Sequence, residues 1–209
     1  MIPTLESTVW KSSQTIGPKA ESLDSAIKEI NAVLPTSRTS ENAKSQISKF
    51  LATHSDALHR TCLDGHLTGS AAIIDHTGSK ILIMLHKKLQ IWIQPGGHAD
   101  GDGNLARVAL REAREETGIE GLKILTPGID CDVHLIPERP DEPEHLHFDV
   151  RYLIHAPKDS CIQKNHESVE MRWMDFDELI QITSDDSTLR LAKVAFEIAN
   201  EQFGVGNVS

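Results

Sequence analysis

The most informative stretch of the 209-residue chain is GHADGDGNLARVALREAREETGI, residues 97–119. Its second half carries Glu112, Glu115 and Glu116, which are spaced at i, i+3 and i+4. On a helix this spacing places all three carboxylates on one face, where each pair repels by roughly 0.2–0.5 kcal/mol. The acids also lie near the C-terminal end of that helix, where the helix dipole disfavours negative charge. Such a cluster requires compensating cations.

Two kinds of cation are available as compensation. The interleaved arginines would make a solvated helix face with ion pairs, and Arg111 can reach Glu115 at i+4. Alternatively, a hard divalent metal ion would bind the clustered carboxylates, usually together with water and substrate phosphates. The flanking sequence favours the metal, because Pro95-Gly96-Gly97 ends an expected strand and a short glycine-containing loop leads into the helix. This arrangement brings free backbone N–H groups close to the carboxylates.

The segment resembles the Nudix box of the Nudix hydrolase superfamily. The positions that fit its pattern in register are Gly97, Arg111, Glu112, Ala113, Glu115, Glu116, Gly118 and Ile119. The first glutamate of the box is replaced by Gly103, and Asp100 and Asp102 are candidate substitutes nearby. In the family this glutamate supports the loop and, in some members, the metal shell. The departure therefore affects an outer contact and leaves the Arg-Glu-x-x-Glu-Glu core intact.

The resemblance implies an α/β (α+β) fold, a mixed-sheet α/β/α sandwich preceded by an N-terminal helical extension. We expect the extension over residues 1–60 and the Nudix hydrolase domain over residues 61–209. In the extension, apolar residues recur at helical spacing from Leu23 to Leu34, and a second helix is expected from Ser40 as its N-cap. These helices are expected to pack on the main domain; the alternatives are a homodimer contact or a lid.

Apolar and turn patterns predict the remaining elements. Residues 70–75 and 80–86 form a predicted hairpin, and Gly118 is expected to end a helix over residues 104–117. Further strands are predicted over 91–94, 129–136, 146–155 and 169–174, and further helices over 175–182 and 186–203. The acidic, proline-containing loop after residue 136 is either a solvated connection or the border of a binding site.

The activity that the resemblance implies is hydrolysis of the pyrophosphate bond in a nucleoside diphosphate linked to another moiety, such as a nucleoside triphosphate or a nucleotide sugar. An acidic protein acting on an anionic substrate needs a bridging cation, Mg²⁺ or Mn²⁺ as its substitute. The implied site residues are Glu112, Glu115, Glu116 and Gly97 for the metal; Glu116, Glu115, Glu167 and Arg111 for catalysis; and Gly96, Gly97, His98 and Trp92 for the substrate. The alternative function is a catalytically weak or inactive Nudix-fold module that binds nucleotides.

The general base has more than one candidate. Glu167 precedes the strand predicted at 169–174 and is our first choice outside the box; Glu170 is the second, and a box glutamate is the alternative. Trp92 either stacks on a base or belongs to the core. Among the eleven histidines, His145 and His147 alternate on a strand and share a face. They either join His98 near the substrate or a metal, or are ordinary strand residues; we interpret the other histidines as incidental.

Composition excludes several other classes of protein. The chain has 31 acidic and 21 basic residues and a formal net charge of −10, which argues against a stable nucleic-acid complex. It has no apolar run of the length that a membrane helix needs and no recognisable secretory signal. Three dispersed cysteines, Cys62, Cys131 and Cys161, favour the reducing cytoplasm. None has the sequence context that the isoprenoid isomerase branch of the fold requires.

Overall fold

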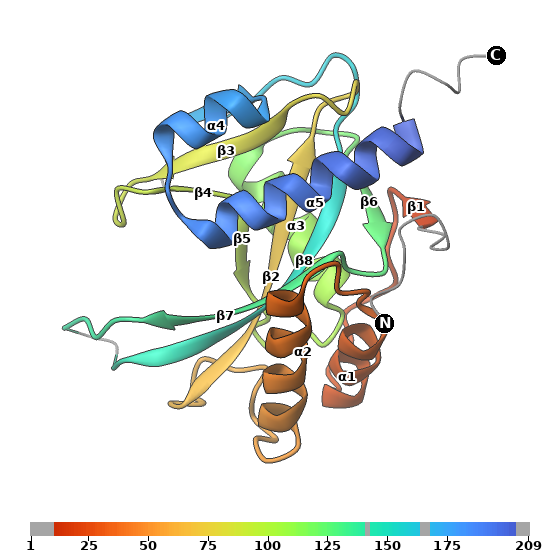
Figure 1. Ribbon diagram of the computed structural model, residues 1–209. Helices are drawn as coiled ribbons and strands as arrows, with labels where there is room; N and C mark the ends of the chain where they lie inside the picture. Colours follow the sequence, from red (N-terminus) through yellow and green to blue (C-terminus); the bar gives the residue numbers. More distant parts are fainter. Residues whose placement is uncertain (1–10, 141–142, 164–167, 204–209) are drawn as a thin grey trace.

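The computed structural model describes residues 11–140, 143–163 and 168–203. In these ranges the chain forms a mixed α/β fold with helices on both faces of one sheet (Figure 1). The strands are β1 (Lys11–Ser13), β2 (Gly65–Ile74), β3 (Ile81–His86), β4 (Trp92–Ile93), β5 (Gly96–His98), β6 (Lys123–Thr126), β7 (Asp130–Ile136), β8 (His145–His155) and β9 (Ser168–Met174). The helices are α1 (Leu23–Ala32), α2 (Arg38–Leu51), α3 (Leu105–Thr117), α4 (Phe176–Ile182) and α5 (Asp186–Phe203).

The two longest strands, β2 and β8, run parallel through the middle of the sheet. The sheet order is β1-β6-β8-β2-β3-β4, while β5 pairs with β2, β7 with β8 and β9 with β3. In the β2–β8 register His66 lies opposite His147, Thr68 opposite Asp149 and Ser70 opposite Arg151. Because neighbouring residues of paired strands point to the same face, polar side chains from both strands gather on one side of the sheet.

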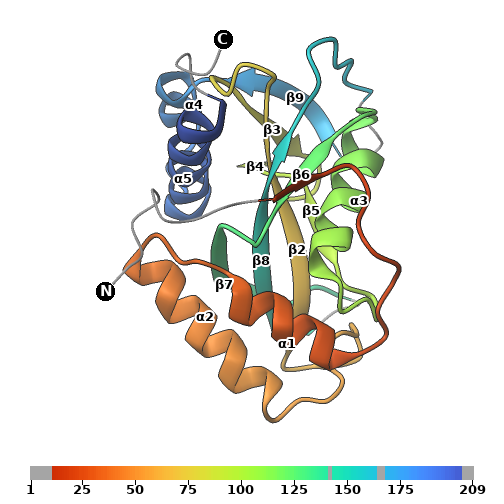
Figure 2. The same ribbon diagram turned by 90° about the vertical axis from the view of Figure 1, so that its right-hand side faces the viewer.

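Alternate residues of β2 serve two different cores. Leu67 and Ala71 belong to a core that α1, α2 and α3 complete, whereas Ala72 and Ile74 belong to a core that α4 and α5 complete. Figure 2 shows α4 and α5 on one side of the sheet and α3 on the other. On the α5 side of β2, Ala72 and Ile74 are covered by the second core, while His66, Thr68 and Ser70 provide polar groups for a site on the same face.

Most of the predicted elements are confirmed. The hairpin corresponds to β2 and β3, which pair antiparallel with Ile73 opposite Leu82. The box helix is α3, and Gly118 caps it in the left-handed conformation at φ 65°. Short strands β1 and β6 were not predicted, because three or four residues carry too little periodicity to be recognised.

Two predictions about local structure were wrong. We expected the Gly96–Gly97 pair only to end a strand, but it begins β5 and pairs with Gly69 and Ser70 of β2. This close pairing needs glycine, since a Cβ at Gly96 would lie 2.9 Å from the Cα of Ser70. Ser40 is not the N-cap of α2: Ser37 has that role, while Ser40 is buried and its Oγ accepts a hydrogen bond from the backbone N–H of Cys131.

Helices α1 and α2 pack directly on the rest of the fold. Ala26, Ile30 and Ile47 are almost fully buried and share one hydrophobic core with β2 and α3. The side-chain ammonium of Lys44 ties the two helices together through the backbone oxygens of Asn31 and Val33. In the part of the chain that the structure describes, no helix has the length and apolar character needed to cross a lipid bilayer.

Candidate functional site

A cleft of about 610 Å³ opens beside the polar half of β2, and Gly97, Glu112 and Glu116 of the box line it. Its charged and imidazole-bearing lining residues are Glu112, Glu116 and Asp149; Arg60, Lys87, Lys88 and Arg139; and His86, His98, His134 and His147. Acidic groups thus lie inside a cleft that also carries several basic side chains. Ile136 ends β7 and Arg139 comes from the loop after it, so this loop does border the cleft.

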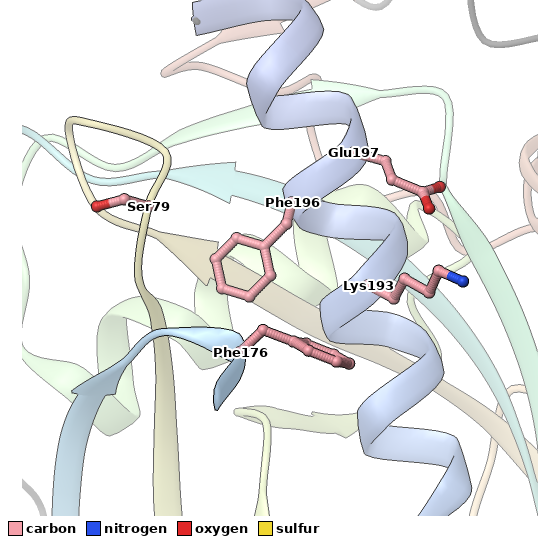
Figure 3. A pocket seen from close by; sticks show the side chains of 5 residues that line it. All are labelled: Ser79, Phe176, Lys193, Phe196 and Glu197. Carbon is pink, nitrogen blue, oxygen red and sulfur yellow. The ribbon is translucent and has the colours of Figure 1, made fainter. Parts of the chain in front are cut away.

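A second hollow, of about 260 Å³, lies beside α5 and differs in character from the cleft. Figure 3 shows Phe176 and Phe196 facing one another there, with ring centroids 6.4 Å apart, while Lys193 and Glu197 point away from the two rings. Aromatic packing accounts for this hollow. The cleft is therefore the place to look for chemistry.

Two box glutamates meet the backbone of β5. Glu116 is 3% exposed, and its Oε2 accepts a hydrogen bond of 2.9 Å from the backbone N–H of Gly96. Glu112 lies so close to Gly97 that a Cβ there would be 2.4 Å from its Cδ. The two glycines therefore let the carboxylates of α3 lie against the strand, in an arrangement that a larger residue would disrupt.

The other two catalytic candidates of the box lie differently. Arg111 donates hydrogen bonds to Oε1 of Glu112 at 2.6 Å and to the backbone oxygen of His98 at 3.0 Å. The expected pairing of Arg111 with a neighbouring glutamate is thus present, and it links α3 to β5. Glu115 is exposed and is not among the residues that line the cleft. The two carboxylates that the fold brings to the cleft from α3 are those of Glu112 and Glu116.

The missing box glutamate has a structural explanation in the N-terminal segment. A Cβ at Gly103 would lie 2.2 Å from the backbone oxygen of Ser22, so residues before α1 occupy the space that a side chain would need. The carboxylate of Glu29, from α1, reaches the start of α3 and accepts hydrogen bonds from the backbone N–H of Ala106 and from the hydroxyl of Tyr152. Burial is the main cause that raises the pKa of Glu29.

The two proposed substitutes for that glutamate have separate roles. Asp102 accepts hydrogen bonds of 3.0 Å from the backbone N–H groups of Ala20 and Asn104, and pairs with Arg107 at 2.7 Å. It therefore supports the loop before α3. Asp100 instead accepts two hydrogen bonds of 2.8 Å from Arg60. This pairing holds Arg60 at the side of the cleft.

Histidines from four strands cluster beside the cleft, and His98, His134 and His147 of this cluster line it. His66 of β2 lies with its ring centroid 4.8 Å from that of His98, 5.0 Å from that of His147 and 4.7 Å from that of His145. His134 of β7 contacts His147 edge-on at 5.3 Å. Our interpretation of the remaining histidines as incidental was wrong for His66 and His134. The parallel register that places His66 opposite His147 joins residues 81 positions apart, which no local pattern reveals.

The rings of His98 and His147 are half-buried, and burial favours their neutral state. Burial, followed by the charge of Arg60, lowers the pKa of His98 to about 4. Burial, followed by the neighbouring His98, lowers the pKa of His147 to about 2. Among the described residues, the buried Nε2 atoms of both rings have no hydrogen-bond partner. An unpartnered buried nitrogen costs about 1–3 kcal/mol, so a bound group would stabilise this arrangement.

An ion network continues along the same two strands, away from the histidines. Asp149 accepts hydrogen bonds from the hydroxyls of Thr68 and Ser70 at 2.8 and 2.9 Å and pairs with Arg151 at 2.8 Å. Arg151 also pairs with Asp130 and Asp132. Asp149 thereby forms part of the cleft wall. The repeated alternation in His145-Leu-His147-Phe-Asp149-Val-Arg151 was the signal for this row, of which we used only the first two members.

Three residues predicted for the site lie elsewhere or cannot be placed. Trp92 packs on the core beside α5, with the guanidinium of Arg172 at 5.4 Å from its ring centroid, and is not among the lining residues of the cleft. Glu170 pairs with Arg172 at 2.5 Å on β9. Glu167, our first candidate for the general base, lies outside the described residues.

Comparisons with known proteins bear on the fold and the family of the chain. No curated protein sequence matches the chain. Among solved structures, the Ap4A hydrolase of C. elegans superposes with a TM-score of 0.51 and 18% identity, over 61% of this chain and 93% of that chain. The dihydroneopterin triphosphate pyrophosphohydrolase of E. coli gives 0.50 and 15%, over 61% and 92%. At these identities the likeness shows the fold. A profile of the NUDIX domain matches residues 66–194, more than half of the chain, and the chain therefore belongs to the NUDIX family.

Proposed function

We propose that this protein is a divalent-metal-dependent pyrophosphohydrolase, which cleaves the pyrophosphate bond of a nucleoside diphosphate linked to another moiety. The observation that supports this best is the meeting of Glu112 and Glu116 with the glycine backbone of β5 inside the cleft. Carboxylate oxygens are the ligands that Mg²⁺ prefers, and nearby basic side chains attract the polyphosphate that the ion accompanies.

The carboxylate end of the cleft fits Mg²⁺ by its donor atoms. Glu112 and Glu116 offer carboxylate oxygens, and we propose that the backbone of Gly97 and the exposed Glu115, one residue before Glu116, complete the protein's part of the site. Mn²⁺ has the same preference for oxygen ligands. When bound, such an ion supplies charge neutralisation at the phosphoryl oxygens and acts as a Lewis acid.

The chain's own residues bind and orient the substrate. Arg60, Lys87, Lys88 and Arg139 line the cleft and favour a polyphosphate locally, although the whole chain carries a net charge of −10. Gly97 leaves room for the carboxylate of Glu112 close to the strand, so that an oxygen ligand for the ion lies at the backbone of β5. Arg111 holds Glu112 in place through its 2.6 Å hydrogen bond.

The attacking water must lose a proton to a carboxylate. We propose Glu167 for this role, with the box glutamates as the alternative. Glu170 is a weaker candidate, because its carboxylate is paired with Arg172 on β9 and it is not among the described residues that line the cleft. Trp92 is likewise a weaker candidate for stacking on a base, since its ring packs beside Arg172.

Turnover of a panel of substrates tests the proposal. The panel contains a nucleoside triphosphate, a nucleotide sugar and a dinucleoside polyphosphate, each with Mg²⁺, with Mn²⁺ and with EDTA. We expect metal-dependent release of nucleotide or phosphate from at least one of them, and a loss of at least about 100-fold in kcat for Glu116→Gln. The matched control is Glu197→Gln, which removes the same charge from an exposed position on α5 and should leave the rate unchanged.

Two results would contradict the proposal. Full activity of Glu116→Gln would remove the carboxylate from the metal site. Tight nucleotide binding by the wild-type protein, with no product under any metal, would instead support a nucleotide-binding module that has kept the fold without turnover.

A further inference from the structure

The histidine cluster beside the cleft contains three potential nitrogen ligands to which the proposed hydrolysis gives no role in metal binding. One nitrogen from each of His66, His98 and His147 lies within 4.8 Å of the other two. The three residues come from β2, β5 and β8, and backbone pairing fixes their positions: His66 lies opposite His147, and His98 lies opposite Thr68. Strand pairing therefore gathers the ligands without any mobile loop.

We propose that His66, His98 and His147 form a separate metal site, which binds a divalent transition-metal ion, Zn²⁺ in the first place. This inference goes beyond the proposed hydrolysis and does not depend on it. The site is distinct from the carboxylate end in its chemistry: imidazole nitrogen suits Zn²⁺, Co²⁺ and related ions, whereas Mg²⁺ prefers oxygen.

The hydrogen bonding of the cluster favours a ligand-binding role for these histidines over a role as ordinary core residues. The Nε2 atoms of His98 and His147 are buried and have no hydrogen-bond partner among the described residues. Apolar side chains at the same places would avoid the cost of about 1–3 kcal/mol that each such nitrogen carries. A metal ion satisfies a neutral imidazole nitrogen directly, and three imidazoles add no negative charge that would favour Mg²⁺.

The geometry requires only a small closing movement. Zinc binds imidazole nitrogen at about 2.0–2.1 Å, so two ligands of a tetrahedral ion stand roughly 3.3 Å apart. The present spread of up to 4.8 Å closes if His98 and His147, which are half-buried at the cleft, rotate toward the buried His66. Three histidines with one open position are also the ligand set of several catalytic zinc sites.

Neighbouring groups are compatible with a cation at this place. The charge of Arg60 near His98 is partly compensated by two hydrogen bonds of 2.8 Å to Asp100. His134, which contacts the far side of His147, has its Nδ1 at 3.0 Å from Asp132. Because His98 and His147 line the cleft, the open position would face the substrate.

Metal binding by tag-free protein, stripped with EDTA, tests this proposal without measuring turnover. We expect titration calorimetry to show one Zn²⁺ per chain, and Co²⁺ to give the visible absorption of a tetrahedral nitrogen-bound ion. His98→Asn and His147→Leu should each weaken Zn²⁺ binding by at least about 100-fold. Glu116→Gln should change it by less than about threefold, and so should the control His76→Asn, which removes an exposed histidine in the β2–β3 turn.

X-ray absorption spectroscopy of the zinc-loaded wild-type protein identifies the ligand atoms of the ion directly. It therefore tests the site even if a variant fails to fold. Scattering from three imidazole rings would support the assignment. Zinc bound by oxygen alone, the absence of Zn²⁺ binding, or binding that Glu116→Gln abolishes while both histidine variants retain it would overturn the site. Because turnover is not measured, none of these results decides whether the protein is a pyrophosphohydrolase.

Discussion

Two polar clusters lie on the same pair of strands, β2 and β8, and satisfy their polar atoms in opposite ways. In the ion network, Arg151 is 2% exposed and its guanidinium reaches Asp130, Asp132 and Asp149, while Ser187 of α5 accepts its remaining hydrogen bonds. In the histidine cluster, buried Nε2 atoms of His98 and His147 have no partner among the described residues.

This difference separates a structural cluster from a functional one. Buried charges that are fully paired hold strands and a helix in place. Removal of one partner leaves the other charges buried without compensation, which destabilises the folded protein. Buried imidazoles with a nitrogen that makes no hydrogen bond contribute little to stability by themselves, and that nitrogen can bind a ligand such as a metal ion. The comparison therefore predicts that equivalent substitutions in the two clusters have very different consequences.

The largest expected effect comes from removing the central arginine of the ion network. Arg151→Leu leaves Asp149 buried without its ion pair and leaves Asp130 and Asp132 with Arg190, so we expect a loss of about 3–5 kcal/mol in the free energy of unfolding. Urea denaturation measures it. As a control, Arg172→Leu removes an exposed ion pair with Glu170 and should leave stability close to that of the wild type. A small loss for Arg151→Leu would show that the network is not structural.

A smaller effect is expected from acid, and the two clusters should respond in different pH ranges. The pKa of His98 is lowered to about 4 and that of His147 to about 2, mainly by burial, so below pH 6.5 the unfolded chain binds protons that the folded protein does not. Stability of the metal-free protein should therefore fall between pH 6.5 and 4. We expect the free energy of unfolding to fall by about 1–2 kcal/mol. This is less than the pKa shifts alone would give, because solvent in the cleft screens the charges.

The ion network should lose stability only at lower pH. Burial by itself would raise the pKa of Asp132, but the hydrogen bond from His134 and the charges of Arg151 and Arg190 lower it overall. Its contribution is therefore complete above the ordinary aspartate pKa of about 3.9 and is lost as the pH falls below that value. Urea denaturation at a series of pH values separates the two ranges. A flat profile from pH 6.5 to 4 would contradict the neutral, buried state of the histidines.

The smallest expected effect on stability comes from the histidine cluster itself. His147→Leu replaces an imidazole whose buried Nε2 has no partner in the described structure with an apolar side chain of similar size. We expect the free energy of unfolding of the metal-free protein to stay within about 1 kcal/mol of wild type, and the acid sensitivity above pH 4 to decrease. A loss of stability as large as that of Arg151→Leu would show that the histidine cluster, like the ion network, serves to stabilise the fold.

The sequence predicts the elements of this fold better than their contacts. The pattern of apolar residues predicts α3, β8 and the second half of β2, whereas the first half of β2, which starts at Gly65, was not predicted. The box glutamates and the glycines of β5 were recognised because their chemistry is local to 23 residues. By contrast, His66 carries no local signal, and its role depends on the β2–β8 register.

Residue 103 shows the same limit. The sequence reveals that the box glutamate is absent, but the reason lies about 80 residues away, where the backbone of Ser22 fills the space and Glu29 reaches Ala106. Burial of the N-terminal helices on the sheet creates these contacts, and no pattern within residues 97–119 contains them. Periodicity within a short stretch of sequence does not determine such long-range packing.

The most direct test of the proposed chemistry is the position of labelled oxygen after turnover in ¹⁸O water. The protein is incubated with Mg²⁺ and the substrate that the panel identifies, and the products are analysed by ³¹P NMR and mass spectrometry. The account predicts that one ¹⁸O atom appears on a phosphorus of one product, because water attacks phosphorus and a P–O–P bond breaks. Label found only on a carbon-bound oxygen, or turnover that is unchanged in EDTA, would contradict it.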